Sequence, residues 1–523
     1  MASRSGHLGT LTDFHYASEA PRVYTGKTMK VLFTLLALPS LAFAQIKAGF
    51  ADREVVPDIG MEFPGNYGKS IAKEIHDSPK VRAAVFDDGK KRIAIVGLDA
   101  LAIRRETAVA ARKLVQEKTG IAPENILLGA SHSHTSGPTV MVLPGEYDHA
   151  DEHVKMLAYE KSSGADPKYL ERFVKGIADA VVAANTNLAE VSLSFGVGKE
   201  DKVSFNRRQR MKNGLSFSHA GRGNPDIVGY AGPIDPDVGV IGAWGKDGKP
   251  LGVVVNFACH ATTGPAPFSA NWIYYLEKTI RGGLGADVPV VFLQGACGDI
   301  TQVDNLDPFA PKNGDYYGQL IGGCVGAEAL KVLYRAERST GPFTVESLVK
   351  TWRIPRRIPE PAKVARSLAM TKRNPKEVGT TEWIFAKEIV MLDALLKEER
   401  DVEVEVQVMQ IGPVALFTTP AEYFVEFGLE FKKKCGFAIA FPVELANGCV
   451  GYVPTEEAFG PNGGGYETRL TSYSNLEITA GRQMLDAGLE LVRKLTPAPL
   501  PAPPKAPDWK EGWSYGNVPA ELK

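Results

Sequence analysis

Short runs of apolar residues recur along the chain, separated by polar segments that contain glycine or proline. Residues 81–87 and 92–98 are two such runs, and the dipeptide Asp88-Gly89 between them is typical of a tight β-hairpin turn. Residues 251–258 instead form an unbroken Val-rich run, which is typical of a strand covered on both faces. The pattern therefore predicts both hairpin strands and fully buried strands.

Longer segments with the apolar spacing of helices lie between these runs. Helices are predicted over residues 104–118, 169–185, 316–334, 381–398, 423–433 and 479–495. Further strands are predicted over residues 46–51, 125–129, 191–197, 238–244, 288–293, 343–354, 402–411, 414–418 and 437–445. Strands that alternate with helices in this way predict an α/β fold, with mixed β-sheets flanked by helices.

Three of the predicted buried strands end in polar segments. Residues 125–129 lead to His132 and His134, residues 251–258 lead to His260, and residues 288–293 lead to the Gly-rich segment 294–299. Ligands of α/β proteins bind at the carboxyl ends of strands, so we expect these segments to share one crevice. On an extended backbone, His132 and His134 would point to the same side. The alternative is a polar turn with two solvated histidines.

Composition and charge exclude some classes of protein. Of the 523 residues, 44% are hydrophobic and 23% are charged, which is typical of a soluble globular protein and excludes global disorder. The formal net charge of -1 gives no electrostatic reason to expect binding to nucleic acid. The function must therefore be inferred from a site.

The first residues have the features of a targeting segment. Residues 29–44 combine a short basic head, an apolar middle too short to span a bilayer, and small residues before Gln45, as in a secretory signal peptide. A buried helix is the alternative, but core helices seldom have this start and ending. Residues 1–28 are polar and without periodicity, so we interpret them as an over-extended translation start. We expect an exported protein, periplasmic or secreted, without a transmembrane span in the mature chain.

The cysteines and the C-terminal tail add little chemistry. Five cysteines are too few for a disulfide framework, and their odd number leaves at least one thiol free, although one or two bridges are compatible with an oxidising compartment. Their spacing resembles no cysteine metal module. Residues 497–523 begin with a Pro-rich stretch and are predicted to form a tail.

Taken as residue types, the polar segments supply His132, His134, His260 and Glu422. Two imidazoles and a carboxylate are the ligands typical of catalytic zinc, which keeps one position open for water. Zinc lowers the pKa of bound water to about 7 and so supplies a nucleophile at neutral pH. The alternatives are a core histidine at a strand end for His260 and a carboxylate at a helix start for Glu422.

A family resemblance adds to this interpretation. The relevant segments are His132-Ser133-His134-Thr135-Ser136-Gly137-Pro138, Asn206-Arg207-Arg208, Asn224-Pro225-Asp226-Ile227 with Gly229-Tyr230 and Ile234-Asp235-Pro236, Pro420-Ala421-Glu422, and Tyr452-Val453-Pro454-Thr455 with Tyr466-Glu467. In type and order they resemble motifs of the neutral ceramidases, and the resemblance covers most of residues 46–490. It implies that residues 45–496 form a ceramidase-like zinc hydrolase domain.

The resemblance also implies roles for single residues. One Zn²⁺ per chain would be held by His132, His260, Glu422 and Tyr452. The catalytic residues would be His134, which orients water or moves a proton, Arg207 and Tyr466, which stabilise the oxyanion, and Thr301. Thr301 takes the place of a serine in the family segment and keeps a hydroxyl there.

The implied reaction is hydrolysis of an N-acyl amide by zinc-activated water, with ceramide cleaved to sphingosine and fatty acid. Such a substrate implies a role in sphingolipid metabolism and transient contact with a membrane surface. Neutral ceramidases continue into an immunoglobulin-like domain, which this chain is expected to lack. The sequence therefore leaves two alternatives open: an exported zinc amidase or esterase that acts on a non-sphingolipid substrate, and a catalytically silent binding protein with the same fold.

Overall fold

The computed structural model describes residues 45–523, except residues 265–266, 286, 311–313, 509, 511 and 517. The segment 29–44 that we interpret as a signal peptide, and residues 1–28 before it, lie outside the described residues. Within the described part of the chain, no helix is both long and apolar enough to cross a membrane.

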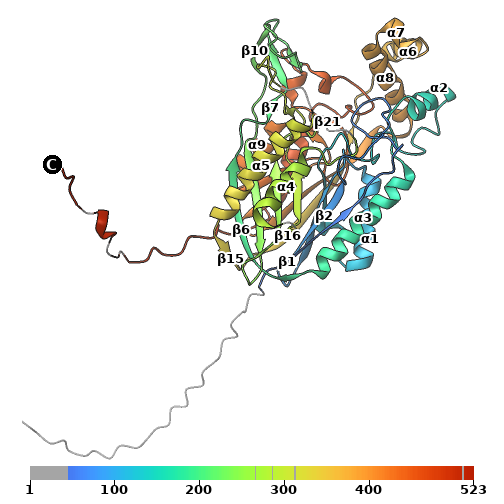
Figure 1. The fold of residues 1–523 in the computed structure, drawn as a ribbon. Helices are drawn as coiled ribbons and strands as arrows, with labels where there is room; N and C mark the ends of the chain where they lie inside the picture. The colour runs from blue at the N-terminus through green and yellow to red at the C-terminus, as the bar shows by residue number, and fades with distance from the viewer. Residues whose placement is uncertain are drawn as a thin grey trace, which may run out of the picture. The chain divides into compact units, whose positions relative to one another are not determined.

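The first of three large sheets contains the predicted hairpin. Its strand order is β4-β3-β2-β1-β5, with all neighbours antiparallel except the parallel pair β3 and β4. The strands are β1 (Lys47–Glu54), β2 (Lys80–Asp87), β3 (Arg92–Leu98), β4 (Ile126–Ala130) and β5 (Ala189–Glu190). Helices α1 (Arg105–Thr119) and α3 (Pro167–Thr186) cover one face (Figure 1). The hairpin around Asp88-Gly89 is therefore confirmed.

The second sheet contains the Val-rich strand. Its order is β13-β12-β11-β6-β15, and only β12 and β13 run parallel. The strands are β6 (Ser192–Lys199), β11 (Asp237–Trp244), β12 (Pro250–Phe257), β13 (Val290–Gln294) and β15 (Arg338–Ser339). Helices α4 (Trp272–Leu284) and α5 (Asp315–Arg335) pack on its outer face. Burial of β12 on both faces explains why its sequence lacks polar alternation.

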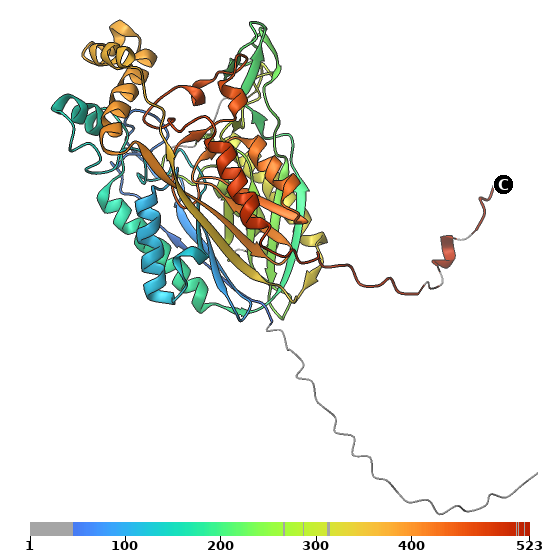
Figure 2. The same cartoon turned by 180° about the vertical axis from the view of Figure 1, so that it is seen from behind.

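The third sheet is built from the C-terminal part of the chain. Its order is β16-β17-β18-β20, with β18 and β20 parallel. The strands are β16 (Val345–Pro355), β17 (Asp401–Ile411), β18 (Val414–Thr418) and β20 (Ile439–Val443). Helices α9 (Val425–Lys434) and α10 (Ala480–Val492) share a core cluster with its outer face, and Figure 2 shows the red helix α10 over this sheet.

One hydrophobic cluster joins the inner faces of the three sheets. It contains Phe86 of β2, Val254 of β12 and Leu416 of β18, all with 0% exposure. Mixed sheets with helices on their outer faces confirm the predicted α/β class. Each sheet also contains one parallel pair of strands. One strand of each pair, β4, β12 or β18, leads directly into a polar segment that contributes to the site described below.

Some elements were not predicted. A small sheet of β10 (Ile227–Tyr230), β8 (Arg208–Met211) and β9 (Ser216–Ser218) and the helices α6 (Pro361–Thr371), α7 (Pro375–Val378) and α8 (Thr380–Glu398) project at the end where β21 (Tyr452–Val453) lies (Figure 1). Of these, only α8 was predicted. Another short helix, α2 (Glu152–Lys155), was also missed. The five cysteines of the described chain are all free thiols, so the structure contains none of the bridges that the sequence left open.

Gly97 of β3, in the first sheet, lies against the backbone of β13 in the second sheet. A Cβ atom added there would lie 2.5 Å from the backbone oxygen of Phe292 in β13. We expect Gly97→Ala to lower the free energy of unfolding by about 1–3 kcal/mol, because two strands would have to move apart. Gly323→Ala in α5 is the control, since a Cβ atom added at Gly323 has no neighbouring atom within 4 Å. This substitution should raise the free energy of unfolding slightly, because alanine favours the helix more than glycine does. Equal denaturation midpoints for Gly97→Ala and wild type would contradict this prediction.

Candidate metal centre

His132 lies just beyond β4 in a strained backbone conformation. Its φ of 60° falls in the left-handed region, which non-glycine residues rarely adopt and which is typical of functional sites. The predicted extended His-Ser-His backbone is therefore wrong at this residue. The two rings nevertheless converge, since the Nε2 atoms of His132 and His134 are 3.2 Å apart.

His260 reaches the same point from the end of β12. Its ring centroid lies 4.4 Å from that of His132, and both rings are buried. The two side chains come from different sheets, 128 positions apart in sequence (132 to 260). The prediction that strand ends share one crevice is confirmed.

Glu422 and Tyr452 are brought together by strand pairing. Glu422 opens β19 (Glu422–Tyr423), which runs parallel to β21, and it lies directly opposite Tyr452 in the register. Residues opposite each other in a strand pair present their side chains on the same face. The Oε2 atom of Glu422 lies 3.2 Å from Nε2 of both His132 and His260. The Glu422 carboxylate therefore lies next to both imidazole rings.

The backbone fixes which nitrogen of each ring carries the proton. The Nδ1 atoms donate to carbonyl oxygens: His132 to Leu101 at 3.0 Å, His260 to Cys297 at 2.8 Å and His134 to Gly65 at 3.2 Å. Because a carbonyl only accepts hydrogen bonds, Nδ1 is protonated and Nε2 of each neutral ring presents a lone pair. Carbonyl partners of this kind orient metal-binding histidines in proteins.

The inward-facing atoms therefore form a set of donors that suits a cation. We call this set the candidate metal centre: the Nε2 atoms of His132, His134 and His260, and Oε2 of Glu422. The ligand atoms of the three histidines all lie within 4.8 Å of one another. Oε2 of Glu422 is buried and has no hydrogen-bond partner within the described chain. Lone pairs that face one another in a buried space, beside a carboxylate, fit a metal ion such as zinc.

The electrostatics agree with this donor set. Burial and the adjacent Arg207 guanidinium lower the pKa of His260 to about 3. Burial and the two neighbouring imidazoles lower the pKa of His134 well below its usual value. Burial opposes ionisation of Glu422, but the imidazoles hold its pKa well below the usual range. Burial also lowers the pKa of His132, yet the Glu422 carboxylate raises it overall, so a cation bound here would compete with a proton.

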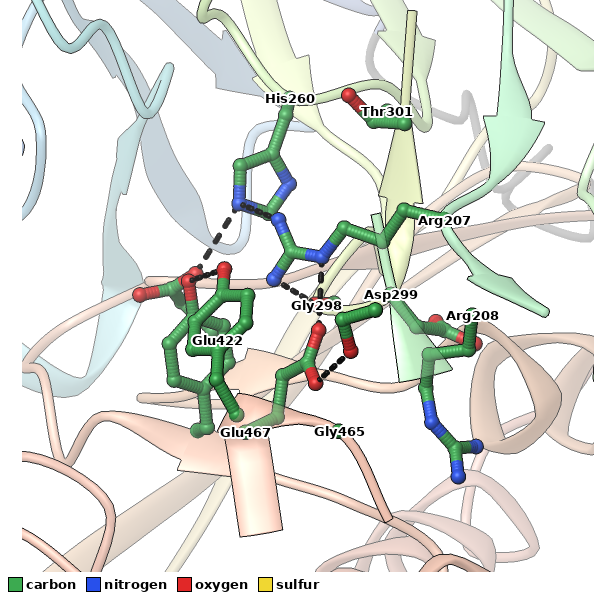
Figure 3. Close-up of polar contacts among 12 residues, drawn as sticks. Arg207, Arg208, His260, Gly298, Asp299, Thr301, Glu422, Gly465 and Glu467 are labelled. Carbon is green, nitrogen blue, oxygen red and sulfur yellow. Dashed lines mark hydrogen bonds and ion pairs between the residues drawn. The ribbon is translucent and has the colours of Figure 1, made fainter. Parts of the chain in front are cut away.

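Arg207 is fixed beside the centre by three hydrogen bonds. Its guanidinium donates to Glu467 at 2.8 Å, to the carbonyl of Gly298 at 2.7 Å and to Nε2 of His260 at 2.9 Å (Figure 3). The donation to His260 agrees with an unprotonated Nε2, and a metal ion bound at that nitrogen would take its single lone pair in place of this hydrogen bond. Arg207 is only 2% exposed and follows the short strand β7 (Phe205–Asn206). Its position is therefore rigid, as an oxyanion-binding group requires.

Two tyrosines complete the wall of a cavity that we call the central cavity. Tyr452 and Tyr466 are joined by a hydrogen bond of 2.9 Å between their hydroxyl groups, and the Arg207 guanidinium lies 5.0 Å from the ring centre of Tyr466. The central cavity measures about 250 Å³. Its lining residues are Gly65, Asn66, Tyr67, Leu101, His132, His134, Met141, Glu422, Tyr452, Tyr466 and Tyr473.

Thr301 is not among the residues that line the central cavity. It belongs to β14 (Ile300–Thr301), which pairs with β7, and its hydroxyl donates to Gln302 at 3.1 Å. In Figure 3 it is drawn at the top, with His260 between it and Glu422. Its catalytic role stays a prediction, as do the separate roles of the other predicted residues. The structure does bring His132, His134, His260, Glu422, Tyr452, Tyr466 and Arg207 together.

Glu444 is a buried carboxylate that the sequence analysis missed. Its Oε2 accepts hydrogen bonds from the backbone N–H groups of Cys297 and Tyr423, both at 2.9 Å. Its Oε1 lies 2.8 Å from the Cys297 thiol, and burial raises its pKa to about 8. Glu444 thus joins the segment whose carbonyl orients His260 to the segment that begins with Glu422. A charged residue within the apolar run 437–445 was the available signal.

Glu444→Ala is expected to weaken zinc binding by about 10–100-fold, the usual effect of losing an outer partner of a metal site. Glu444→Gln should stay near wild type, because an amide oxygen can accept both N–H groups. Competition with a chromophoric chelator measures the affinities. Equal losses in the alanine and glutamine variants would assign the effect to charge rather than to positioning.

The fold and the site thus define an α/β protein with a histidine-rich candidate metal centre where strands of different sheets end. The structure is similar to two solved structures: the neutral ceramidase from Pseudomonas aeruginosa (TM-score 0.62, 20% identity, 88% of this chain and 77% of that chain) and a ceramidase complexed with C2 (TM-score 0.61, 19% identity, 88% and 77%). The chain therefore has the fold of neutral ceramidase.

A sequence comparison finds a similarity to the same kind of protein. The chain is 28% identical over 153 residues to the neutral ceramidase of Pseudomonas aeruginosa strain PAO1, a match that spans 29% of this chain and 20% of that protein. No family model matches the chain. The resemblance to the neutral ceramidases that we identified from motifs is confirmed by both similarities.

Proposed function

We propose that the protein is a zinc-dependent hydrolase that cleaves an N-acyl amide, with ceramide as the first candidate substrate. The observation that carries the proposal is the convergence of the Nε2 atoms of three histidines and the buried Oε2 of Glu422 beside the fixed guanidinium of Arg207. The motif resemblance and the ceramidase fold support the choice of an amide. His132, His260, Glu422 and Tyr452 would hold the ion.

A zinc ion bound there would activate water and polarise a carbonyl group. The chain's own residues would do the rest. Arg207 and the Tyr466 hydroxyl would donate hydrogen bonds to the oxygen of the tetrahedral intermediate, because both lie at the centre in fixed positions. His134, whose Nε2 carries a lone pair toward the cavity, can accept a proton there and pass it to the leaving amine.

The proposal is tested with the full-length protein, purified in the presence of zinc. We expect about one zinc per chain and release of fatty acid from N-acyl sphingosine, lost on chelation and restored by zinc. Absence of bound zinc after it is supplied would overturn the proposal. Bound zinc with cleavage only of soluble amides or esters would instead favour the non-sphingolipid alternative, and bound zinc without turnover the silent binding protein.

We also propose that the protein is exported, on the basis of residues 29–44. N-terminal sequencing of the protein recovered from its natural host should then begin at Gln45. Recovery of intact residues 29–44 in the mature protein would contradict export through a cleaved signal peptide.

A further inference from the structure

The wall of the central cavity includes a segment that is neither helix nor strand. We call residues 64–69 the wall segment, because Gly65, Asn66 and Tyr67 all line the central cavity. Within the described chain, the backbone of the wall segment forms only two hydrogen bonds, and both are made with side chains from other parts of the chain. The position of this wall therefore depends on two side chains, those of His134 and Lys387.

The first of these hydrogen bonds orients the His134 ring. Nδ1 of His134 donates to the carbonyl of Gly65 at 3.2 Å. The approach is close, since a Cβ atom added at Gly65 would lie 2.5 Å from Nδ1 and 2.9 Å from Cβ of His134. The φ of Gly65, 120°, also favours glycine. The ring therefore lies directly against the wall segment, and a shift of the segment would remove the acceptor of the ring proton.

The second hydrogen bond comes from a buried lysine of α8. Nζ of Lys387 donates to the carbonyl of Tyr67 at 2.7 Å and to the hydroxyl of Ser162 at 2.6 Å. It also pairs with Glu388 at 3.0 Å, and the two charged side chains are only 1% and 3% exposed. Because an ammonium group has three N–H donors, these three partners account for all of them.

Fold stability alone does not explain why a lysine occupies this position. Lysine is almost never fully buried unless it is paired, and apolar residues of similar volume are often as stable as a buried ion pair. A charged donor instead fixes one carbonyl in one place. Phe385, two positions before Lys387, packs its ring 6.0 Å from the ring of Tyr67, so α8 contacts both the backbone and the side chain of that tyrosine.

We propose that Lys387 is a positioning residue. Through the carbonyl of Tyr67 it holds the wall segment in place, and the carbonyl of Gly65 then keeps the proton of His134 on Nδ1 and its Nε2 free. Lys387 is not among the residues that line the central cavity, so it acts through the segment. Its effect on turnover rests on the proposed function, whereas its effect on the wall segment and on the His134 ring does not.

The structural effect is tested first, on the full-length protein after treatment with a chelator, so that turnover plays no part. Lys387→Met combined with Glu388→Gln removes the ammonium without leaving an unpaired buried carboxylate. A second version with Glu388→Met replaces the ion pair by two apolar side chains, which are often tolerated at such positions, and serves if the first does not fold.

Two measurements are made on the folded double variant. Cleavage by chymotrypsin after Tyr67 should become at least about tenfold faster, because loss of one hydrogen bond to a charged group raises the population of the open segment by that factor. Two-bond ¹H–¹⁵N NMR spectra should show the His134 proton on Nδ1 in wild type and shared between both nitrogens in the variant. Ser162→Ala is the matched control, since it removes another partner of Lys387 but keeps the bond to Tyr67. It should behave as wild type in both measurements.

Three results would overturn the inference: unchanged cleavage after Tyr67 in the double variant, a His134 proton that stays on Nδ1 there, or an active enzyme whose kcat survives the double substitution. With zinc restored and fully bound, kcat of the double variant should fall by about 10–100-fold, the effect of a small displacement of a reacting group, while Ser162→Ala keeps its kcat. A displaced His134 proton in a protein whose wild type shows no turnover would count against the proposed function, not against the role of Lys387.

Discussion

Replacing His260 with alanine is expected to weaken zinc binding by more than about 100-fold and to abolish hydrolysis. Loss of an outer partner alone costs about 10–100-fold in metal affinity, and loss of a ligand must cost more. The change also leaves Oε2 of Glu422 with one imidazole neighbour and removes the acceptor of one Arg207 hydrogen bond. Elemental analysis and chelator competition on the purified variant measure the effect.

The control for this variant is His149→Ala. The His149 ring bonds to the carbonyl of Ala394 at 3.0 Å and takes no part in the candidate metal centre. Its zinc content should equal that of wild type. Full zinc content in His260→Ala, with melting unchanged, would mean that the ion binds elsewhere, and the assignment of the centre would then be wrong.

Most strands of the large sheets could be predicted because a few neighbouring residues are enough to indicate each of them. The Asp88-Gly89 turn fixes a hairpin within 20 residues, and the Val-rich run of β12 needs only its own sequence to indicate burial. The strands β8 and β9 gave no such signal. They are only four and three residues long, and polar residues such as Arg208 and Ser216 dominate them. Their pairing depends on neighbours rather than on periodicity.

Some residues of the candidate site could also be predicted from local sequence patterns, and others could not. His132 and His260 could be predicted from sequence because each follows a buried strand, and strand ends are where α/β proteins place their ligands. The position of Tyr452 opposite Glu422 could not, because it depends on a two-residue pairing between segments 30 positions apart (422 to 452). That tyrosine was found through the family resemblance alone. The left-handed backbone of His132 was equally invisible, since nothing in its own sequence requires it.

Arg207→Lys should lower kcat by about 10²–10³-fold while zinc remains bound, because it removes the oxyanion donor but no proposed metal ligand. The lysine keeps a positive charge beside Glu467. In Arg207→Ala the buried Glu467 carboxylate would be left unpaired, at a cost of about 3–5 kcal/mol. The free energy of unfolding should therefore fall less in Arg207→Lys than in Arg207→Ala. A single ammonium cannot reproduce the fork that bonds Glu467, the carbonyl of Gly298 and His260 together. Steady-state kinetics with zinc analysis on the same sample separate chemistry from metal loss.

Arg208→Lys is the matched control for that variant. The guanidinium of Arg208 bonds to the carbonyl of Gly464 at 3.1 Å and packs over Phe424. Arg208 is therefore adjacent to Arg207 in sequence and equally buried, but it does not share the contacts of Arg207 at the centre. Its kcat should stay within about threefold of wild type, the size of a weak hydrogen bond. If Arg207→Lys raised KM and left kcat intact, the guanidinium would bind the ground state and transition state equally. The oxyanion would then depend on Tyr466 and the metal, and Tyr466→Phe would become the variant with the larger loss of kcat.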